Sequence, residues 1–205
     1  AQAIALLVQI ILARILSPSD YGTIALLLVF INILQVFVDS GLGNALIQKK
    51  EADDLDFSTI FLFNCVLCLV LYALLAIAAP YIASFYHDDS LVSLIRVLGI
   101  TLFISGLRNV QQAYVARKML FRLFFISTLI ALVVSAVISI GMAYSGYGVW
   151  ALVAQNLIAN GLGTVILWFM ADWRPQLVFC SKRFRRLFSF GSKLMLSALL
   201  ETCYN

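Results

Sequence analysis

Long apolar segments separated by short polar turns recur along the whole chain, and they constrain its fold more than any other feature. A helix needs about 20 mostly apolar residues to cross the hydrocarbon core of a bilayer. Segments of this kind predict membrane-spanning helices at about residues 1–16, 21–47, 58–84, 91–115, 124–144 and 149–171. Hydrophobic residues make up 63% of the chain and charged residues 12%, whereas soluble domains carry about 25% charged residues. The chain is therefore predicted to be an all-α, polytopic integral membrane helix bundle.

The two ends of the chain do not coincide with complete spans. A helix over residues 1–16 rises only about 24 Å, against a hydrocarbon core of about 30 Å, and the sequence is still apolar near residue 200. We therefore expect a piece of a longer protein that lacks part of its first helix. Residues 172–186 are predicted to form a polar linker and residues 187–205 the beginning of a seventh span.

Polar side chains recur along one face of two predicted spans. They are Asn32, Gln35, Asp39 and Gly43 in the earlier span, and Thr101, Ser105, Arg108 and Gln112 in the later one. Intervals of four, three and four residues place these positions on one side of each helix. A guanidinium inside a span costs roughly 2.5–3.5 kcal/mol on insertion scales and rarely faces lipid. Both polar faces are therefore predicted to lie inside the bundle.

Asp39 and Arg108 are expected at matching depth in the membrane. Each lies about 26 Å along a span that runs in the same direction, at a rise of about 1.5 Å per residue. We hypothesise that the two side chains neutralise each other or share one polar cavity. The alternative that remains open is a purely structural ion pair, which would lock two helices together.

Lys and Arg residues are distributed unevenly over the predicted loops, and this distribution predicts the orientation. With alternate loops assigned to opposite sides, one side holds Lys49, Lys50, Arg117, Lys118, Arg122, Arg174, Lys182, Arg183, Arg185 and Arg186, and the other holds Arg14 and Arg96. The basic side is expected in the cytoplasm, together with the N-terminus. Trp173 on that side and Tyr144, Tyr147 and Trp150 on the other suit the aromatic belts of the two interfaces. The net charge of +4 is thus not a nucleic-acid signal.

Side chains that would support catalysis or hold a metal or cofactor are not arranged in a recognisable pattern. His87 is expected in a solvated turn. Asp53, Asp54 and Asp56 are interpreted as a solvated cytoplasmic loop that balances neighbouring lysines. Cys65 and Cys68 lie in an apolar segment, where thiols usually pack. We therefore predict neither an enzyme nor a metal or cofactor site.

Several short blocks resemble bacterial polysaccharide exporters. Residues 13–22 (ARILSPSDYG) and 37–50 (FVDSGLGNALIQKK) look like the opening of the branch that includes the colanic acid and teichuronic acid exporters, relatives of the O-antigen flippases. Residues 148–155, 173–175 and 190–194 resemble later blocks of that branch in the same order. Each block is short, and their order and spacing make the resemblance specific.

The resemblance implies a transporter of the multidrug/oligosaccharidyl-lipid/polysaccharide flippase superfamily, with two helical lobes and alternating access. Residues 1–171 would be the N-terminal lobe, residues 172–186 the inter-lobe linker and residues 187–205 the beginning of the C-terminal lobe. The implied substrate is an undecaprenyl-diphosphate-linked oligosaccharide, moved from the inner to the outer leaflet of the bacterial inner membrane. Implied partners are the lipid bilayer, H⁺ or Na⁺ as coupling ion and other polysaccharide export proteins.

Candidate substrate-binding residues follow from the polar faces and this implied substrate. Arg108 is expected to bind the diphosphate, because arginine pairs with phosphate oxygens through two hydrogen bonds. The expected neighbours are Gln111, Gln112, Asn32, Gln35 and Asp39. Weaker candidates are Arg14 and Arg96, which lie near helix ends where snorkelling suffices. Glu201 in the seventh span is a further weak candidate, as a coupling carboxylate.

Two other functions remain open at this point. A cation-coupled multidrug exporter of the same superfamily would favour acidic and aromatic groups over Arg108 in its cavity. A membrane-embedded glycan polymerase or ligase would be an enzyme acting on the same lipid-linked substrates, and it would need a large external loop with paired Arg or His residues. A scaffold without transport activity is disfavoured, because it has no need of Asp39 and Arg108 inside the membrane.

Overall fold

The chain folds into a bundle of apolar helices. The computed structural model describes residues 2–39, 43, 46–47, 53–171, 173–176, 178, 180, 185 and 188. Its helices are α1 (Gln2–Ile15), α2 (Pro18–Asp39), α4 (Asp54–Tyr86), α5 (Ser90–Arg117), α6 (Phe121–Tyr144) and α7 (Val149–Met170). Five of these are long and apolar enough to span a membrane, and α1 is shorter. The predicted all-α membrane bundle is confirmed for this part of the chain, while Lys49, Lys50, Glu201 and the seventh span lie outside the described residues.

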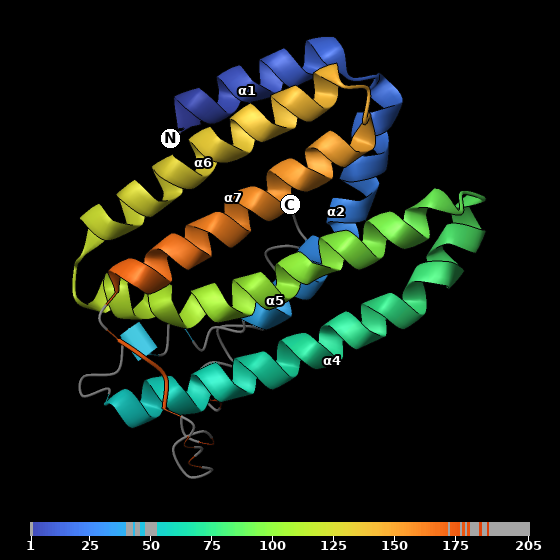
Figure 1. Ribbon diagram of the computed structural model, residues 1–205. Coiled ribbons are helices and arrows are strands. Elements are labelled where there is room, and N and C mark those ends of the chain that lie inside the picture. Colours follow the sequence, from blue (N-terminus) through green and yellow to red (C-terminus); the bar gives the residue numbers. More distant parts are fainter. Residues whose placement is uncertain are drawn as a thin grey trace, which may run out of the picture.

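The helices are arranged around α5. Figure 1 shows α1, α6, α7, α5 and α4 following one another across the bundle, with α2 crossing behind α7 and α5. The helices α4 and α5 form one antiparallel hairpin, and α6 and α7 form another. Because α5 contacts α2, α4, α6 and α7, it is the element that connects the two hairpins to the crossing helix.

The centre of the bundle is built by close approach at small residues of α5. A Cβ atom on Gly99 would lie 3.0 Å from the ring of Tyr72 in α4. One on Gly106 would collide with the Sγ atom of the buried Cys68. Glycine at these two positions therefore allows α4 and α5 to pack closely, which is the usual role of small residues between membrane helices.

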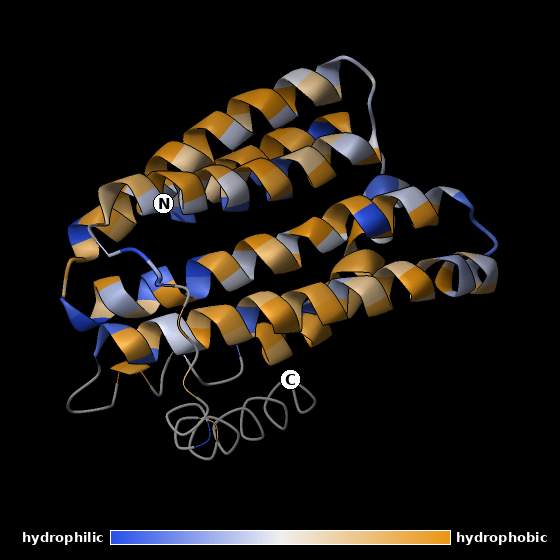
Figure 2. Ribbon diagram, turned by 60° about the horizontal axis from the view of Figure 1, so that its bottom comes forward, coloured by the Kyte–Doolittle hydropathy of each residue, from blue (hydrophilic) through white to orange (hydrophobic). Residues whose placement is uncertain are grey.

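One face of α4 stays uncovered and apolar. The exposed residues on it are Val66, Leu69, Val70, Leu74, Ile77, Tyr81 and Phe85. Figure 2 shows that hydrophobic residues dominate the middle of the helices, while hydrophilic residues gather near their ends and turns. An exposed apolar face of this length is what a helix bundle presents to lipid, and this agrees with a multi-pass membrane protein.

The start of α4 corrects the prediction of a solvated acidic loop. Asp54 and Asp56 lie in the first turn of α4, and Asp56 is fully buried. Its Oδ2 atom accepts a hydrogen bond of 3.1 Å from the backbone N–H of Asp53, which satisfies a donor that the helix end leaves free. Asp53 and Asp54 are exposed, as predicted, and the prediction failed only for Asp56, because a capping role draws this acid into the first turn.

Trp173 was expected at the membrane interface, and the structure corrects this prediction. Its side chain is 5% exposed and packs among aromatic residues of α4 and α5, with ring centroids 5.7 Å from Phe57 and 6.1 Å from Tyr114. The backbone after it is also held, because Gln176 donates its N–H to Ser58 Oγ at 3.0 Å. Residues 173–176 are therefore docked on one end of the α4–α5 hairpin.

Candidate functional site

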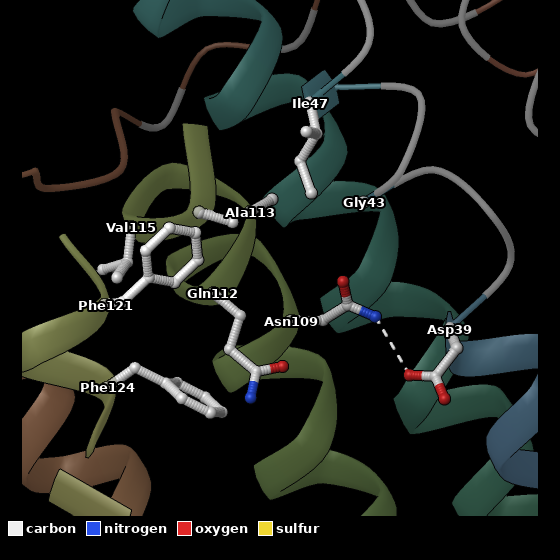
Figure 3. Close-up of a pocket in the computed structure, with 10 residues that line it drawn as sticks. Asp39, Gly43, Ile47, Asn109, Gln112, Ala113, Val115, Phe121 and Phe124 are labelled. Carbon is white, nitrogen blue, oxygen red and sulfur yellow. Dashed lines mark hydrogen bonds between the residues drawn. The ribbon is translucent and has the colours of Figure 1, made fainter. Parts of the chain in front are cut away.

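A pocket of about 490 Å³ opens between the ends of α2, α5 and α6. The described residues that line it are Asp39, Gly43, Ile47, Asn109, Gln112, Ala113, Val115, Ala116, Phe121 and Phe124. Figure 3 shows the polar groups on the α2 and α5 sides and the two phenylalanines on the α6 side. The pocket lies at the same end of the bundle as Arg117, Lys118 and Arg122. We call this end the basic end.

Asp39 is held in the pocket by amides. Its Oδ1 atom accepts hydrogen bonds from Asn109 Nδ2 at 3.1 Å and from Gln35 Nε2 at 3.2 Å. The bond to Asn109 is the dashed line in Figure 3 and joins α2 to α5. The expected equal depth of Asp39 and Arg108 agrees with this contact, because Asn109 is the next residue along α5.

The hypothesis that Asp39 and Arg108 neutralise each other or share one polar cavity is corrected in both parts, because Asp39 is bonded to other residues and Arg108 does not line the pocket that contains Asp39. Within the described chain, the carboxylate is bonded to Gln35 and Asn109 and not to a cation. The physical reason is the rotation of α5, since consecutive residues of a helix point about 100° apart. Asn109 takes the side that faces α2, and Arg108 is turned toward α6 and α7.

Arg108 lies inside the bundle, behind one wall of the pocket. Its Cζ atom lies 5.6 Å from the ring centroid of Phe124, which lines the pocket from α6. Its Nη1 atom lies 3.6 Å from the position that a Cβ on Gly163 of α7 would occupy. The Nε atom is buried and has no hydrogen-bond partner among the described residues. The arginine is thus directed into protein, as predicted, and its Nε donor is unsatisfied there.

The other predicted site residues are separated by the structure. Gln112 lines the pocket and Gln35 supports Asp39. Gln111 is fully buried on another side of α5, where it donates from Nε2 to the carbonyl of Trp173 at 3.3 Å. Asn32, Arg14 and Arg96 are exposed and do not line the pocket. Glu201 lies outside the described residues.

Sequence reasoning missed Asn109, Phe121 and Phe124. A signal for Asn109 was present, because Ser105, Asn109 and Gln112 follow at intervals of four and three, just as Ser105, Arg108 and Gln112 do at three and four. The two rows overlap on α5, and only the rotation of the helix decides which row faces α2. The phenylalanines had no distinguishing signal, since apolar side chains surround them along most of their segment.

The arrangement combines groups that suit an amphipathic ligand. Amides of Asn109 and Gln112 can donate and accept hydrogen bonds, the rings of Phe121 and Phe124 offer apolar surface, and the guanidinium of Arg108 offers charge just behind. Among the described residues, no group of three or more His, Cys, Asp or Glu side chains could hold a metal ion. Ionisable residues inside a membrane bundle generally mark a substrate or ion pathway.

A multi-pass helix bundle with a polar pocket and an intramembrane cation has the features of a membrane transport protein. Residues 11–205 match the family described as polysaccharide biosynthesis protein, and the chain belongs to this family. The predicted membership of a polysaccharide exporter family is thereby confirmed.

The names of similar proteins agree with this family assignment. The succinoglycan biosynthesis transport protein ExoT of Rhizobium meliloti is 27% identical over 88% of this chain and 37% of its own length. The teichuronic acid biosynthesis protein TuaB of Bacillus subtilis is 31% identical over 82% of the chain and 35% of its own length. The lipopolysaccharide biosynthesis protein WzxC of Escherichia coli is 28% identical over 44% of the chain and 18% of its own length. The chain thus spans about a third of the first two relatives, and no solved structure matches it significantly.

Proposed function

We propose that the chain is the N-terminal lobe of a transporter that moves lipid-linked oligosaccharide repeat units from the inner to the outer leaflet of the bacterial inner membrane. The family and the names of the relatives support a role in polysaccharide export. The proposal adds the cargo, an oligosaccharide on undecaprenyl diphosphate, and a mechanism of alternating access between this lobe and a second one that begins after a linker at residues 172–186.

Arg108 is the observation that carries this proposal. Within the described chain its guanidinium contacts the ring of Phe124, its Nε atom is buried without a hydrogen-bond partner, and it lies next to a pocket that is open at one end of the bundle. A diphosphate is the anion best matched to a guanidinium, because charge-assisted hydrogen bonds to phosphate oxygens are strong and directional. In this proposal Arg108 binds the diphosphate, and Gln112 donates a further hydrogen bond to its phosphate oxygens.

The basic end of the bundle is proposed to face the cytoplasm, with the N-terminus on the same side. Arg117, Lys118 and Arg122 cluster there, as the positive-inside rule requires of a cytoplasmic side. The pocket beside Asp39 would then open toward the leaflet in which the lipid-linked substrate is made. The proposal also includes H⁺ or Na⁺ as the coupling ion and contacts with other export proteins. It assigns no residue to either role.

A cation-coupled multidrug exporter is the second candidate, and one observation favours it. The pocket contains the carboxylate of Asp39 opposite the rings of Phe121 and Phe124, a combination that suits cationic drugs. Arg108 argues against it, since a buried cation at the pocket wall repels such cargo. An assay with both kinds of substrate separates the two functions.

The test is complementation of a deletion strain with the full-length protein. Loss of the protein should deplete surface polysaccharide and accumulate lipid-linked repeat units on the cytoplasmic face. Arg108→Gln should fail to complement, Arg108→Lys should complement weakly, and Arg122→Gln, an exposed arginine at the basic end, serves as the matched control. Normal surface polysaccharide in a deletion strain without a redundant exporter would overturn the proposal, and increased drug sensitivity in that strain would favour the second candidate.

A further inference from the structure

A second pocket of about 370 Å³ lies between α1, α2, α6 and α7. Its lining residues are Gln9, Tyr21, Ile24, Ala25, Leu28, Leu132, Ser135, Leu152, Gln155, Asn156, Ala159 and Asn160. None of these residues carries a charge. On α2 this pocket reaches from Tyr21 to Leu28, whereas the first pocket begins at Asp39, so the two lie at opposite ends of that helix. We call the second one the amide pocket.

The amides of this pocket keep unused hydrogen-bonding capacity. Asn160 donates from Nδ2 to the side-chain oxygen of Asn156 at 2.9 Å and to its carbonyl at 3.0 Å. Within the described chain, the side-chain amides of Gln9, which is exposed, and of Gln155, which is half-buried, have no hydrogen-bond partner. Polar groups that are not needed to hold helices together are expensive in a membrane bundle, and so they are expected to meet water or a ligand.

The ligand chemistry follows from the lining. A carboxamide offers two donors and an acceptor, which matches a hydroxyl group that both donates and accepts. The tyrosine ring and the leucines of the pocket offer apolar surface for the C–H faces of a pyranose. Because the lining contains neither a cation nor a carboxylate, it has no counter-charge for a phosphate or an amine. An uncharged polyol is the class that fits these groups best.

Arg108 lies between the two pockets. On α7, Gly163 follows one helical turn after Asn160, which lines the amide pocket, and a Cβ at Gly163 would lie 3.6 Å from Arg108 Nη1. On α6, Phe124 lines the first pocket and lies under the same guanidinium. A ligand with its anionic group at Arg108 would therefore have uncharged amides on one side. Along α2 the two pockets are separated by about 16 Å, measured from Asp39 to Leu28 at a rise of about 1.5 Å per residue.

We propose that the amide pocket binds neutral sugar residues of the cargo, beyond the diphosphate that Arg108 holds. This inference rests on the proposed function and adds a subsite of stated chemistry to it. Gln9 and Gln155 supply the hydrogen bonds to sugar hydroxyls. The pocket thus selects for uncharged glycans, while Arg108 recognises the lipid diphosphate that every cargo shares.

The test compares two ligands on the full-length protein in detergent micelles: undecaprenyl diphosphate, and the same lipid carrying a neutral tetrasaccharide. The wild-type protein should bind the glycosylated lipid more tightly, and Gln9→Leu with Gln155→Leu should remove roughly a fivefold to tenfold preference, as expected for two neutral hydrogen bonds. The affinity for the bare lipid should not change. Gln2→Leu, on the same helix but outside the pocket, is the matched control.

The outcomes distinguish this inference from the function on which it rests. A preference that survives the double substitution overturns the amide pocket as a sugar subsite and leaves the lipid-linked cargo intact. Failure of the wild-type protein to bind either lipid overturns both. Amide oxygens also suit Na⁺, so binding is repeated with choline in place of sodium. A cation site would be indicated if Na⁺ stabilised the wild-type protein against heat and the double substitution removed this stabilisation while the sugar preference stayed intact. This outcome overturns the inference.

Discussion

Asn109 donates a hydrogen bond from Nδ2 to Oδ1 of Asp39 across 3.1 Å, and this contact joins α5 to α2 at the mouth of the first pocket. Gln35 donates to the same oxygen from one turn earlier on α2. The carboxylate is therefore held by two neutral amides and not by the nearby guanidinium. Arg108 is left without this partner and can attract an anion from outside the chain.

The first prediction concerns the coupling between Asp39 and Asn109. Asn109→Ala and Asp39→Ala should each lower the free energy of unfolding, and the double substitution should cost less than their sum by about 1 kcal/mol, as hydrogen bonds between membrane helices usually contribute. Thermal unfolding of the full-length protein in detergent measures this coupling. Asn109→Ala combined with Arg96→Gln, an exposed residue nearly half the length of α5 away, should be additive. Additivity of the Asp39 pair would contradict the contact.

Periodicity predicted the spans, because a lipid solvent leaves little freedom in where an apolar segment of 20 residues goes. Its prediction that both polar faces lie inside the bundle is wrong for Asn32 of α2, which is exposed. Periodicity could not predict partners across the bundle. Arg108 and Asn109 belong to two overlapping polar rows of α5, and the rotation of α5 that selects between them is fixed by packing of Gly99 and Gly106 against α4. The burial of Trp173 could not be predicted from periodicity either, because its partner Phe57 lies far away in the sequence.

The second prediction tests this packing. Gly106→Ala places a methyl group against Cys68 Sγ, with the carbonyl oxygen of Asn64 at 3.7 Å, and should lower the stability by about 1–3 kcal/mol. Removing the sulfur makes room, so Cys68→Ala should restore most of the stability in the Gly106→Ala background. Gly141→Ala in α6, where a Cβ meets nothing within 4 Å, is the control and should be neutral or stabilising. The midpoint of thermal unfolding reports each effect, and a lack of rescue would argue against the α4–α5 contact.

The third prediction concerns pH and the turn before α5. Asp88 Oδ1 accepts hydrogen bonds from the Ser90 hydroxyl at 2.6 Å and the Ser90 N–H at 2.9 Å, and these bonds lower the pKa of the Asp88 carboxyl. A lowered pKa stabilises the fold above the unfolded value of about 3.9, and the effect is lost as the pH falls through the folded value. The difference in melting temperature between wild type and Asp88→Ala should therefore vanish in acid. Asp89→Ala, next in sequence, is the control. A difference that is constant from pH 3 to 7 would contradict the role of the carboxylate.

The last prediction separates two adjacent glutamines that sequence reasoning treated alike. Gln111 is fully buried and bonded to the Trp173 carbonyl, whereas Gln112 lines the pocket. Gln111→Leu should accelerate hydrogen exchange in residues 173–176 and lower the stability by about 1 kcal/mol or less, because the substitution also removes the Oε1 atom, which is buried without a partner among the described residues. Gln112→Leu should leave this exchange unchanged and weaken binding of undecaprenyl diphosphate carrying a sugar. Each variant is the control of the other, measured by exchange mass spectrometry and lipid binding on the full-length protein. If Gln111→Leu weakened binding without loosening residues 173–176, the face of α5 directed at the cargo would have to be reassigned.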